Sequence, residues 1–281
     1  MKQRWLVVFL GLPLMLLVLL ACPPWATGLL VCGVAAIAAY ELLHVAGKGA
    51  DAAVYTVTIA ATICQVILLY CCYAYGDLTF SAPLDPLWLA PLVLTCALFL
   101  LAVTRYGTER AVPFSTVAVG FLGGAAFPMA YGCVLLLRMH EAYGKLYVLA
   151  PFCIAFVGDA FSMYGGMLFG KKKLAPAVSP HKTVAGAIAG PIGSVLALLL
   201  FGFIGSRLTD YAPNYAILAL LGVVGNLFGQ LGDLSMSVVK REAGLKDYSR
   251  LFLTHGGMLD RFDSSMFIAP VVYLFVALGM I

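Results

Sequence analysis

The sequence predicts an all-α, polytopic integral membrane protein with about nine transmembrane helices and a cytoplasmic N-terminus. Of its 281 residues, 63% are hydrophobic and only 11% are charged, whereas about a quarter of the residues in a soluble domain are charged. The mean hydropathy is +1.00. Long apolar runs recur along the chain, and Lys and Arg are concentrated in alternate segments between them. These observations place nearly all of the chain in lipid.

A helix of about 20 apolar residues crosses the hydrocarbon of a bilayer. Nine runs of about this length occur with short segments between them, which predicts one compact membrane domain without a linker. The expected helices are residues 5–21, 25–43, 53–75, 86–104, 114–137, 147–169, 184–205, 213–236 and 264–281. The first run imitates a secretion signal, but it is long, and Cys22-Pro23-Pro24 is a poor cleavage site. We therefore expect it to be retained as a helix.

The positions of Lys and Arg predict the orientation of these helices, because cytoplasmic segments carry an excess of both. With the N-terminus in the cytoplasm, only Arg138, Lys145 and Arg207 fall on the outer side, which leaves 14 of the 17 inside. The C-terminus is then outside. The polar segments 170–183 and 237–263 face the cytoplasm, where nucleotides are found.

Residues that could carry chemistry are unevenly distributed. We assign residues 1–145 to a scaffold of transmembrane helices and residues 146–281 to a catalytic region containing both polar segments. In the scaffold, the glycines between Gly120 and Gly124 indicate close helix packing, and Pro128 indicates a kink. Glu41, His44 and Asp51 flank a loop, so we expect them to be solvated. The eight Cys include no CxxC pair and are interpreted as small buried hydrophobic residues.

The end of the sixth predicted helix carries the first candidate site residues. Asp159 lies in a hydrophobic helix, where a carboxylate is costly unless it faces a polar cavity. Ser179 and Lys182 follow in the polar segment, and both can donate hydrogen bonds to a phosphate. The run Lys171–Lys173 has two interpretations that the sequence leaves open: an anchor on anionic head groups, or a contact with a substrate phosphate.

The eighth predicted helix has two unusual faces. One face lacks side chains and lets a neighbouring backbone approach closely; it consists of Gly222, Gly225, Gly229 and Gly232. Beside it runs a polar stripe made of Asn226, Gln230, Asp233, Ser237, Lys240 and Arg241. Hydrogen bonds between helices account for the two amides. They do not account for a carboxylate, a hydroxyl and two cations at the cytoplasmic end.

The last polar segment ends in His255-Gly256-Gly257, followed by Asp260 and Asp263. Paired glycines let backbone amides turn toward a phosphate. The two acids are three residues apart and share a helix face; if Asp233 faces them, three carboxylates converge. Mg²⁺ usually takes one or two carboxylates together with substrate phosphates, which predicts phosphoryl or nucleotidyl transfer. The simpler explanation, an acidic helix N-terminus with a surface Arg–Asp pair, accounts for the acids one by one but not for the whole array.

Together these residues resemble the signature of the phosphatidate cytidylyltransferases, also called CDP-diacylglycerol synthases. That signature reads S-x-x-K-R-x4-K-D-x-[GSA]-x2-[LIF]-[PGS]-x-H-G-G-x-x-D-R-x-D. It is matched here by Ser237, Lys240, Arg241, Lys246, Asp247, Ser249, Phe252, His255, Gly256, Gly257, Asp260, Arg261 and Asp263. The likeness extends upstream to about residue 157. Three positions depart from the family pattern: Leu253 replaces a small residue or Pro, and Ala185 and Met236 replace acids.

The resemblance implies the reaction of CTP with phosphatidate to give CDP-diacylglycerol and pyrophosphate. It implies Mg²⁺ on Asp233, Asp260 and Asp263, with Ser237 nearby, and leaves open whether one cation or two are held there. The cations implied for the nucleotide phosphates are Lys240, Arg241, Lys246 and Arg261, beside Asp247, His255, Gly256 and Gly257. The lipid phosphate is expected at Ser179, Lys182 and Asp159. The implied partners are CTP, phosphatidate and the bilayer of the cytoplasmic membrane, and not nucleic acid.

Other interpretations stay open. The three departures leave room for a different lipid-phosphate acceptor or for reduced activity. A CTP-dependent polyprenol kinase would share a nucleotide site but not the full signature. A transporter would use an intramembrane polar stripe, but no inverted repeat is visible. A homodimer is compatible with so glycine-rich a surface, although nothing in the sequence requires one.

Overall fold

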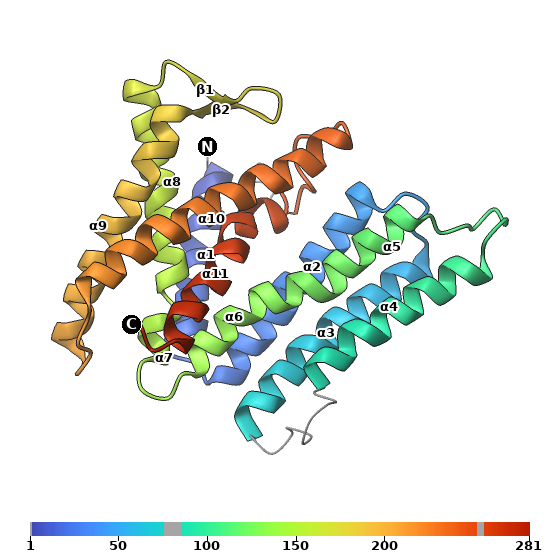
Figure 1. Cartoon of the computed structure of the whole chain (residues 1–281), viewed down its shortest axis with the longest axis horizontal. Helices are drawn as coiled ribbons and strands as arrows, with labels where there is room; N and C mark the ends of the chain where they lie inside the picture. Colours follow the sequence, from blue (N-terminus) through green and yellow to red (C-terminus); the bar gives the residue numbers. More distant parts are fainter. Residues whose placement is uncertain (1, 76–85, 252–255) are drawn as a thin grey trace. The chain divides into compact units, whose positions relative to one another are not determined.

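The structure is a computed structural model that describes residues 2–75, 86–251 and 256–281 (Figure 1). Helices make up most of the described chain, and there are two short strands. The elements are α1 (Lys2–Leu20), α2 (Pro24–Ala46), α3 (Ala52–Tyr75), α4 (Pro86–Thr104), α5 (Phe114–Phe121), the π-helix η1 (Leu122–Ala126), α6 (Phe127–Met139), α7 (Gly144–Tyr147), α8 (Ala150–Phe169), β1 (Lys173–Ala175), β2 (Ser179–Thr183), α9 (Val184–Leu208), α10 (Tyr215–Glu242) and α11 (Leu259–Ala277).

Seven helical segments in the described ranges are long and apolar enough to cross a membrane. They coincide with the second to the eighth predicted helices and run Pro24–Ala46, Ala52–Tyr75, Leu87–Thr104, Phe114–Met139, Gly144–Phe169, Val184–Leu208 and Tyr215–Glu242. The prediction of a helical, multi-pass membrane protein is confirmed. Helices α1 and α11 lie where the first and ninth spans were expected, but α11 begins with three charged residues in its first five positions. The count of nine stays a prediction.

The chain packs as two compact units. Unit 1 comprises Met1–Met139 and Glu242–Arg261, and unit 2 comprises His140–Arg241 and Phe262–Ile281. The loop that follows α10 therefore packs on the unit built by the N-terminal helices. The expected division into a scaffold (1–145) and a catalytic region (146–281) concerned function, and it stays a prediction.

Unit 1 is a bundle in which α2 packs against α3 and α6, and α3 also packs against α4 (Figure 1). Its glycines allow the close approach that the sequence predicted. A Cβ atom on Gly124 would lie 2.6 Å from a methyl carbon of Leu94. The π-turn η1 lies just before Pro128, whose missing N–H cannot continue the regular ladder of helix hydrogen bonds.

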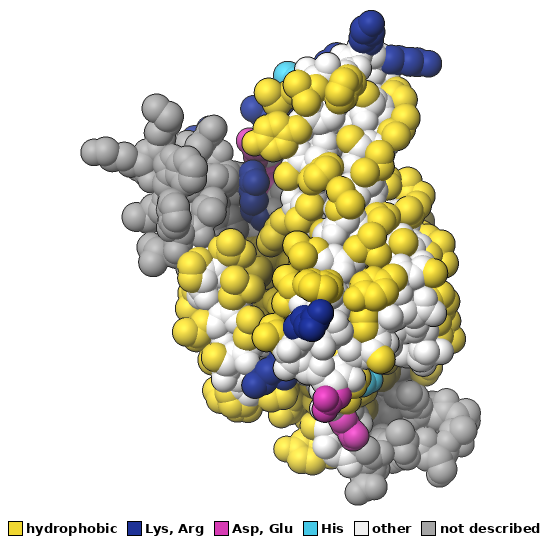
Figure 2. All heavy atoms as spheres, turned by 90° about the vertical axis from the view of Figure 1, so that its left-hand side faces the viewer, with side chains coloured by type: hydrophobic (Ala, Val, Ile, Leu, Met, Phe, Trp, Pro, Cys, Tyr) yellow, Lys and Arg dark blue, Asp and Glu magenta, His cyan; other side chains and the backbone are white. Residues whose placement is uncertain are grey.

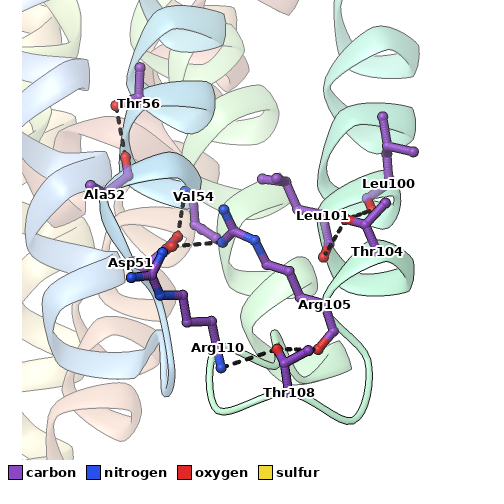
Figure 3. Close-up of polar contacts among 10 residues, drawn as sticks. All are labelled: Asp51, Ala52, Val54, Thr56, Leu100, Leu101, Thr104, Arg105, Thr108 and Arg110. Carbon is purple, nitrogen blue, oxygen red and sulfur yellow. Dashed lines mark hydrogen bonds and ion pairs between the residues drawn. The ribbon is translucent and has the colours of Figure 1, made fainter.

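An ion pair joins two loops at one end of unit 1 (Figure 3). The Arg105 guanidinium lies 2.7 Å from Asp51 Oδ2, and the Val54 amide donates to the other oxygen of Asp51 at 3.3 Å. Asp51 thus also caps the first turn of α3. The guanidinium beside Asp51 lowers the pKa of that carboxyl below its usual value. The expectation that Asp51 is merely solvated was incomplete.

Unit 2 is built around the pair α8 and α9, which pack along their length and are joined by a short hairpin (Figure 1). Segment 170–183 was expected to be a loop, but it contains the antiparallel strands β1 and β2. Thr183 ends the hairpin and caps α9, because its hydroxyl accepts a hydrogen bond from the Gly186 amide at 3.1 Å. The fixed hairpin places Lys182 directly before this helix.

Exposed apolar side chains mark the lipid-facing surface of the helices. On α9, Ile188, Leu196 and Leu200 are each more than half exposed. Figure 2 shows that hydrophobic side chains cover much of the length of the helices on this face, while Lys and Arg lie toward both ends. Such a band is stable in hydrocarbon and costly in water.

Candidate active site

The middle of α10 is held in unit 2 by its glycines and amides. A Cβ atom on Gly222 would lie 2.8 Å from the Val195 backbone in α9. Asn226 donates to Ser194 at 2.9 Å, and Gln230 donates to Asn226 at 2.7 Å and to the Ala187 carbonyl at 3.0 Å. The predicted close approach along the glycine face and the predicted hydrogen bonds between helices are both confirmed. They fix the part of α10 that leads to the candidate site.

One turn further along, Asp233 receives two partners. Lys182 of β2 lies 2.6 Å from its Oδ2, and Ser237 donates to its Oδ1 at 3.3 Å. The sequence assigned Lys182 to the lipid phosphate and Asp233 to a metal. The structure brings these two groups into direct contact, so a ligand that engages either of them must affect the other.

The C-terminal end of α10 contributes two cations with different surroundings. Lys240 is 8% exposed, close to the 6% of Ser237, whereas Arg241 is exposed. The Nε atom of Arg241 donates to the Val178 carbonyl in the turn between β1 and β2 at 3.1 Å. Arg241, expected to bind nucleotide, therefore also ties the hairpin to α10.

The remaining predicted residues of unit 2 lie around this cluster. Asp263 is 7% exposed on the first turns of α11, and its Oδ1 accepts the Ser264 amide at 2.7 Å. It lies within electrostatic range of Asp233, Lys240 and Asp159. Its backbone oxygen also lies 2.8 Å from where a Cβ atom on Gly232 would stand. Asp159 is exposed on α8, and Ser179 is half-buried on β2. Unit 2 thus gathers three acids with Lys182, Lys240 and Ser237.

Unit 1 holds the other part of the signature, in the loop before α11. Both described hydrogen bonds to the Asp260 side chain go to Oδ2, from the amides of Tyr248 and Gly257, each at 2.8 Å. Gly256 adopts a φ of +81°, which a residue with a side chain rarely adopts. These bonds fold the loop back on the start of α11. The expected role of the glycines toward a phosphate stays a prediction.

Three further charged side chains of this unit are exposed: Lys246 and Asp247 in the loop, and Arg261 at the start of α11. His255 and the departure Leu253 lie outside the described residues. The other two departures from the family pattern lie within the described residues. Met236 is 5% exposed on α10, so the usual acid is replaced there by a core residue, and Ala185 lies on the first turn of α9.

The donor atoms suit a hard divalent cation. Carboxylate and hydroxyl oxygens at Asp233, Ser237 and Asp263 are the ligand types that Mg²⁺ prefers. Within residues 2–75, 86–251 and 256–281, no three His, Cys, Asp or Glu side chains form a metal site by themselves. Mg²⁺ does not require such a set, because substrate phosphates and water complete its shell. The residues therefore fit a metal that arrives together with a nucleotide.

Sequence reasoning missed one residue. Glu41 of α2 was expected to be solvated, but it is 2% exposed and accepts three hydrogen bonds from the loop that carries the signature. The available signal was its place inside an apolar helix, where a carboxylate must find partners. Its partners lie more than 200 residues further along the chain, so spacing alone could not identify them.

The chain is similar to known proteins along nearly its whole length. A family model described as the cytidylyltransferase family matches residues 2–278. The chain belongs to this family. Each of three similar curated proteins bears the name phosphatidate cytidylyltransferase. The protein from Bacillus subtilis strain 168 is 30% identical over 279 residues, covering 99% of this chain and 98% of its own.

The other two relatives are matched over shorter segments. The Rickettsia bellii protein is 32% identical over 189 residues, which are 66% of this chain and 81% of its own. The Staphylococcus haemolyticus protein is 40% identical over 129 residues, which are 46% of this chain and 48% of its own. The match thus spans about half the length of the staphylococcal relative. The family fits the combination of cations, acids and glycines described above.

Proposed function

We propose that this cytidylyltransferase-family protein transfers a cytidylyl group from CTP to phosphatidate, giving CDP-diacylglycerol and pyrophosphate. One observation supports this most directly. Lys182, Asp233, Ser237, Lys240 and Asp263 come together at one end of unit 2, which is a membrane-spanning helical unit. Carboxylates, which suit a metal, and ammonium groups, which suit phosphates, thus lie together in this unit. The names of the relatives agree with the proposal.

The chemistry follows from the charges. A phosphate oxygen of phosphatidate attacks the α-phosphorus of CTP, a new P–O bond forms, and the bond to pyrophosphate breaks. The phosphate monoester is already an anion near neutral pH, so the attack needs no strong base. Mg²⁺, when bound, neutralises charge that develops on the phosphate oxygens. Lys240, Arg241, Lys246 and Arg261 are proposed to hold the triphosphate.

The lipid and the metal have separate proposed ligands. Asp233, Asp260 and Asp263 are the proposed metal ligands; two of them lie three residues apart on α11. Lys182 and Ser179 are proposed to receive the phosphate of phosphatidate, near Asp159. The Lys182–Asp233 contact supports this placement, because Lys182 would become available to a lipid phosphate if Asp233 were to hold a divalent cation.

We also propose nine spans in the cytoplasmic membrane, with the N-terminus and the site on the cytoplasmic side. The support is the bias of Lys and Arg, of which 14 of 17 fall on one side in this arrangement. A cytoplasmic site gives access to CTP.

A different lipid-phosphate acceptor is the second candidate, because Met236 occupies with a buried apolar side chain a position where the family usually has an acid. One assay separates the two. Purified protein in detergent is given phosphatidate, Mg²⁺ and CTP labelled at the α-phosphate, with Asp260→Asn beside it and the exposed loop residue Asp210→Asn as control.

We expect label in the lipid with the unmodified protein and with Asp210→Asn, and a loss of at least about 100-fold with Asp260→Asn. Bound CTP without lipid label would indicate another acceptor or an inactive relative. Failure to bind CTP at all would contradict the enzyme and favour a transporter.

A further inference from the structure

A buried carboxylate in the N-terminal half of the chain contacts the signature loop. Glu41 lies near the end of α2, within an apolar helix, and is 2% exposed. Removing a carboxylate from water is costly unless hydrogen bonds replace its hydration. Among the described residues, the partners that replace hydration here are Ser249, Met258 and Leu259, which belong to the same unit.

Both oxygens of Glu41 are engaged. Oε1 accepts from the Ser249 hydroxyl at 2.6 Å and from the Met258 amide at 3.0 Å, and Oε2 accepts from the Leu259 amide at 2.8 Å. The two amides stand at the start of α11, where helix N–H groups have no partner within the helix. A negative charge is also favourable there, because the helix dipole places partial positive charge at this end.

The same carboxylate explains why residue 257 is glycine. A Cβ atom there would lie 2.5 to 2.7 Å from the Glu41 carboxylate atoms, closer than such atoms approach. On its other side, the Gly257 amide donates to Asp260 at 2.8 Å. The backbone from Gly256 to Leu259 is therefore held between two carboxylates, one from α2 and one from α11.

We propose that Glu41 is a positioning residue for the reaction: it fixes the backbone of Gly256–Leu259 and, through it, the orientation of Asp260 and Arg261. The Met258 and Leu259 amides donate to a side chain anchored in a bundle helix, and these two hydrogen bonds hold this backbone in one conformation. The inference rests on the proposed function for its catalytic consequence, but not for the conformational one. A pure folding role would stabilise unit 1 without changing how substrates are handled.

The variant Glu41→Gln tests this with little change of shape. The amide keeps one acceptor oxygen and turns an N–H₂ group toward a donor, so at least one loop amide loses its partner. Ser249→Ala is a milder companion, because it removes one of the three bonds and leaves the carboxylate in place. Glu109→Gln, at an exposed residue of unit 1, is the matched control.

Two measurements are made on full-length protein in detergent. Hydrogen exchange of the Met258 and Leu259 amides is expected to become about tenfold faster or more in Glu41→Gln and unchanged in Glu109→Gln. In the labelled-CTP assay, kcat/KM for CTP is expected to fall about 10- to 100-fold in Glu41→Gln. For Ser249→Ala we expect a fall of about threefold. Thermal unfolding is recorded for every variant.

The outcomes separate the two proposals. Lack of activity in the unmodified protein contradicts the proposed function and leaves the exchange experiment decisive for Glu41. Unchanged exchange at residues 258 and 259 overturns the positioning role. The positioning role is also overturned if Glu41→Gln loses stability while kcat and KM of its folded fraction equal those of Glu109→Gln. If Glu41→Gln does not fold, the same readouts on Ser249→Ala decide, and unchanged exchange and kcat/KM in that variant overturn the proposal.

Discussion

At the scale of single residues, the Lys182–Asp233 contact links the residue expected to bind the lipid phosphate with a residue expected to bind the metal. The sequence predicted these two roles separately. An ammonium group 2.6 Å from a carboxylate neutralises it and can be displaced by a divalent cation. We expect Lys182→Met to raise the KM for phosphatidate about tenfold, because the lipid phosphate loses a charged donor. The KM for CTP should change less. Steady-state kinetics with each substrate varied in turn measures both; a rise confined to CTP would contradict the assignment of Lys182 to the lipid.

The Asp51–Arg105 pair gives a prediction about pH. The pKa of Asp51 is lowered in the folded protein, so its contribution to stability is present above the unfolded value of about 3.9 and is lost as the pH falls through the folded value. The side chains of Asp51 and Arg105 are 32% and 22% exposed, so the ion pair contributes only about 0.2–1 kcal/mol to the free energy of unfolding. Asp51→Asn keeps the cap on α3 and removes the charge. The unfolding free energy of Asp51→Asn should be lower than that of the unmodified protein by a constant amount from pH 7 to pH 5. This difference should shrink below about pH 4. A deficit that persists at lower pH would contradict this.

At the scale of elements, the glycine face of α10 gives a stability prediction. A Cβ atom on Gly222 would lie 2.8 to 3.1 Å from backbone atoms of Val195 and Ser194, which cannot move aside as a flexible side chain can. We expect Gly222→Ala to destabilise the protein by about 1–3 kcal/mol. Gly33→Ala on α2 is the control, because no atom lies within 4 Å of the added carbon. Thermal unfolding in detergent compares the two variants. Equal midpoints would show that the packing of α9 against α10 does not require the close backbone approach at Gly222.

How far the sequence predicted each element depends on the range of the interaction that shapes it. The helix positions, the glycine face and the hydrogen bonds from Asn226 and Gln230 to a neighbouring helix follow from periodicity within one helix, and these predictions are confirmed for the seven described spans. The hairpin β1–β2 was missed because it is short and surrounded by helix signals. Glu41 was missed because its partners are distant in sequence. The site residues stay predictions, since their roles depend on ligands and not on local structure.

At the scale of the whole molecule, the arrangement in the membrane decides whether CTP can reach the site. Nine spans place the N-terminus and the segments 170–183 and 242–258 on one side, and residues 140–146 and 209–214 on the other. Reporter domains that are active on only one side of the membrane, fused after Lys172, Glu242 and Asp210, test this arrangement. We expect cytoplasmic activity after Lys172 and Glu242 and outer activity after Asp210, because Lys and Arg are retained inside. A fusion at the C-terminus should report from outside. The same side for both termini would mean that α1 or α11 does not span, and the count would be eight. The reverse orientation would place Lys182 and Lys240 outside, away from CTP, and would contradict the proposed reaction together with the topology.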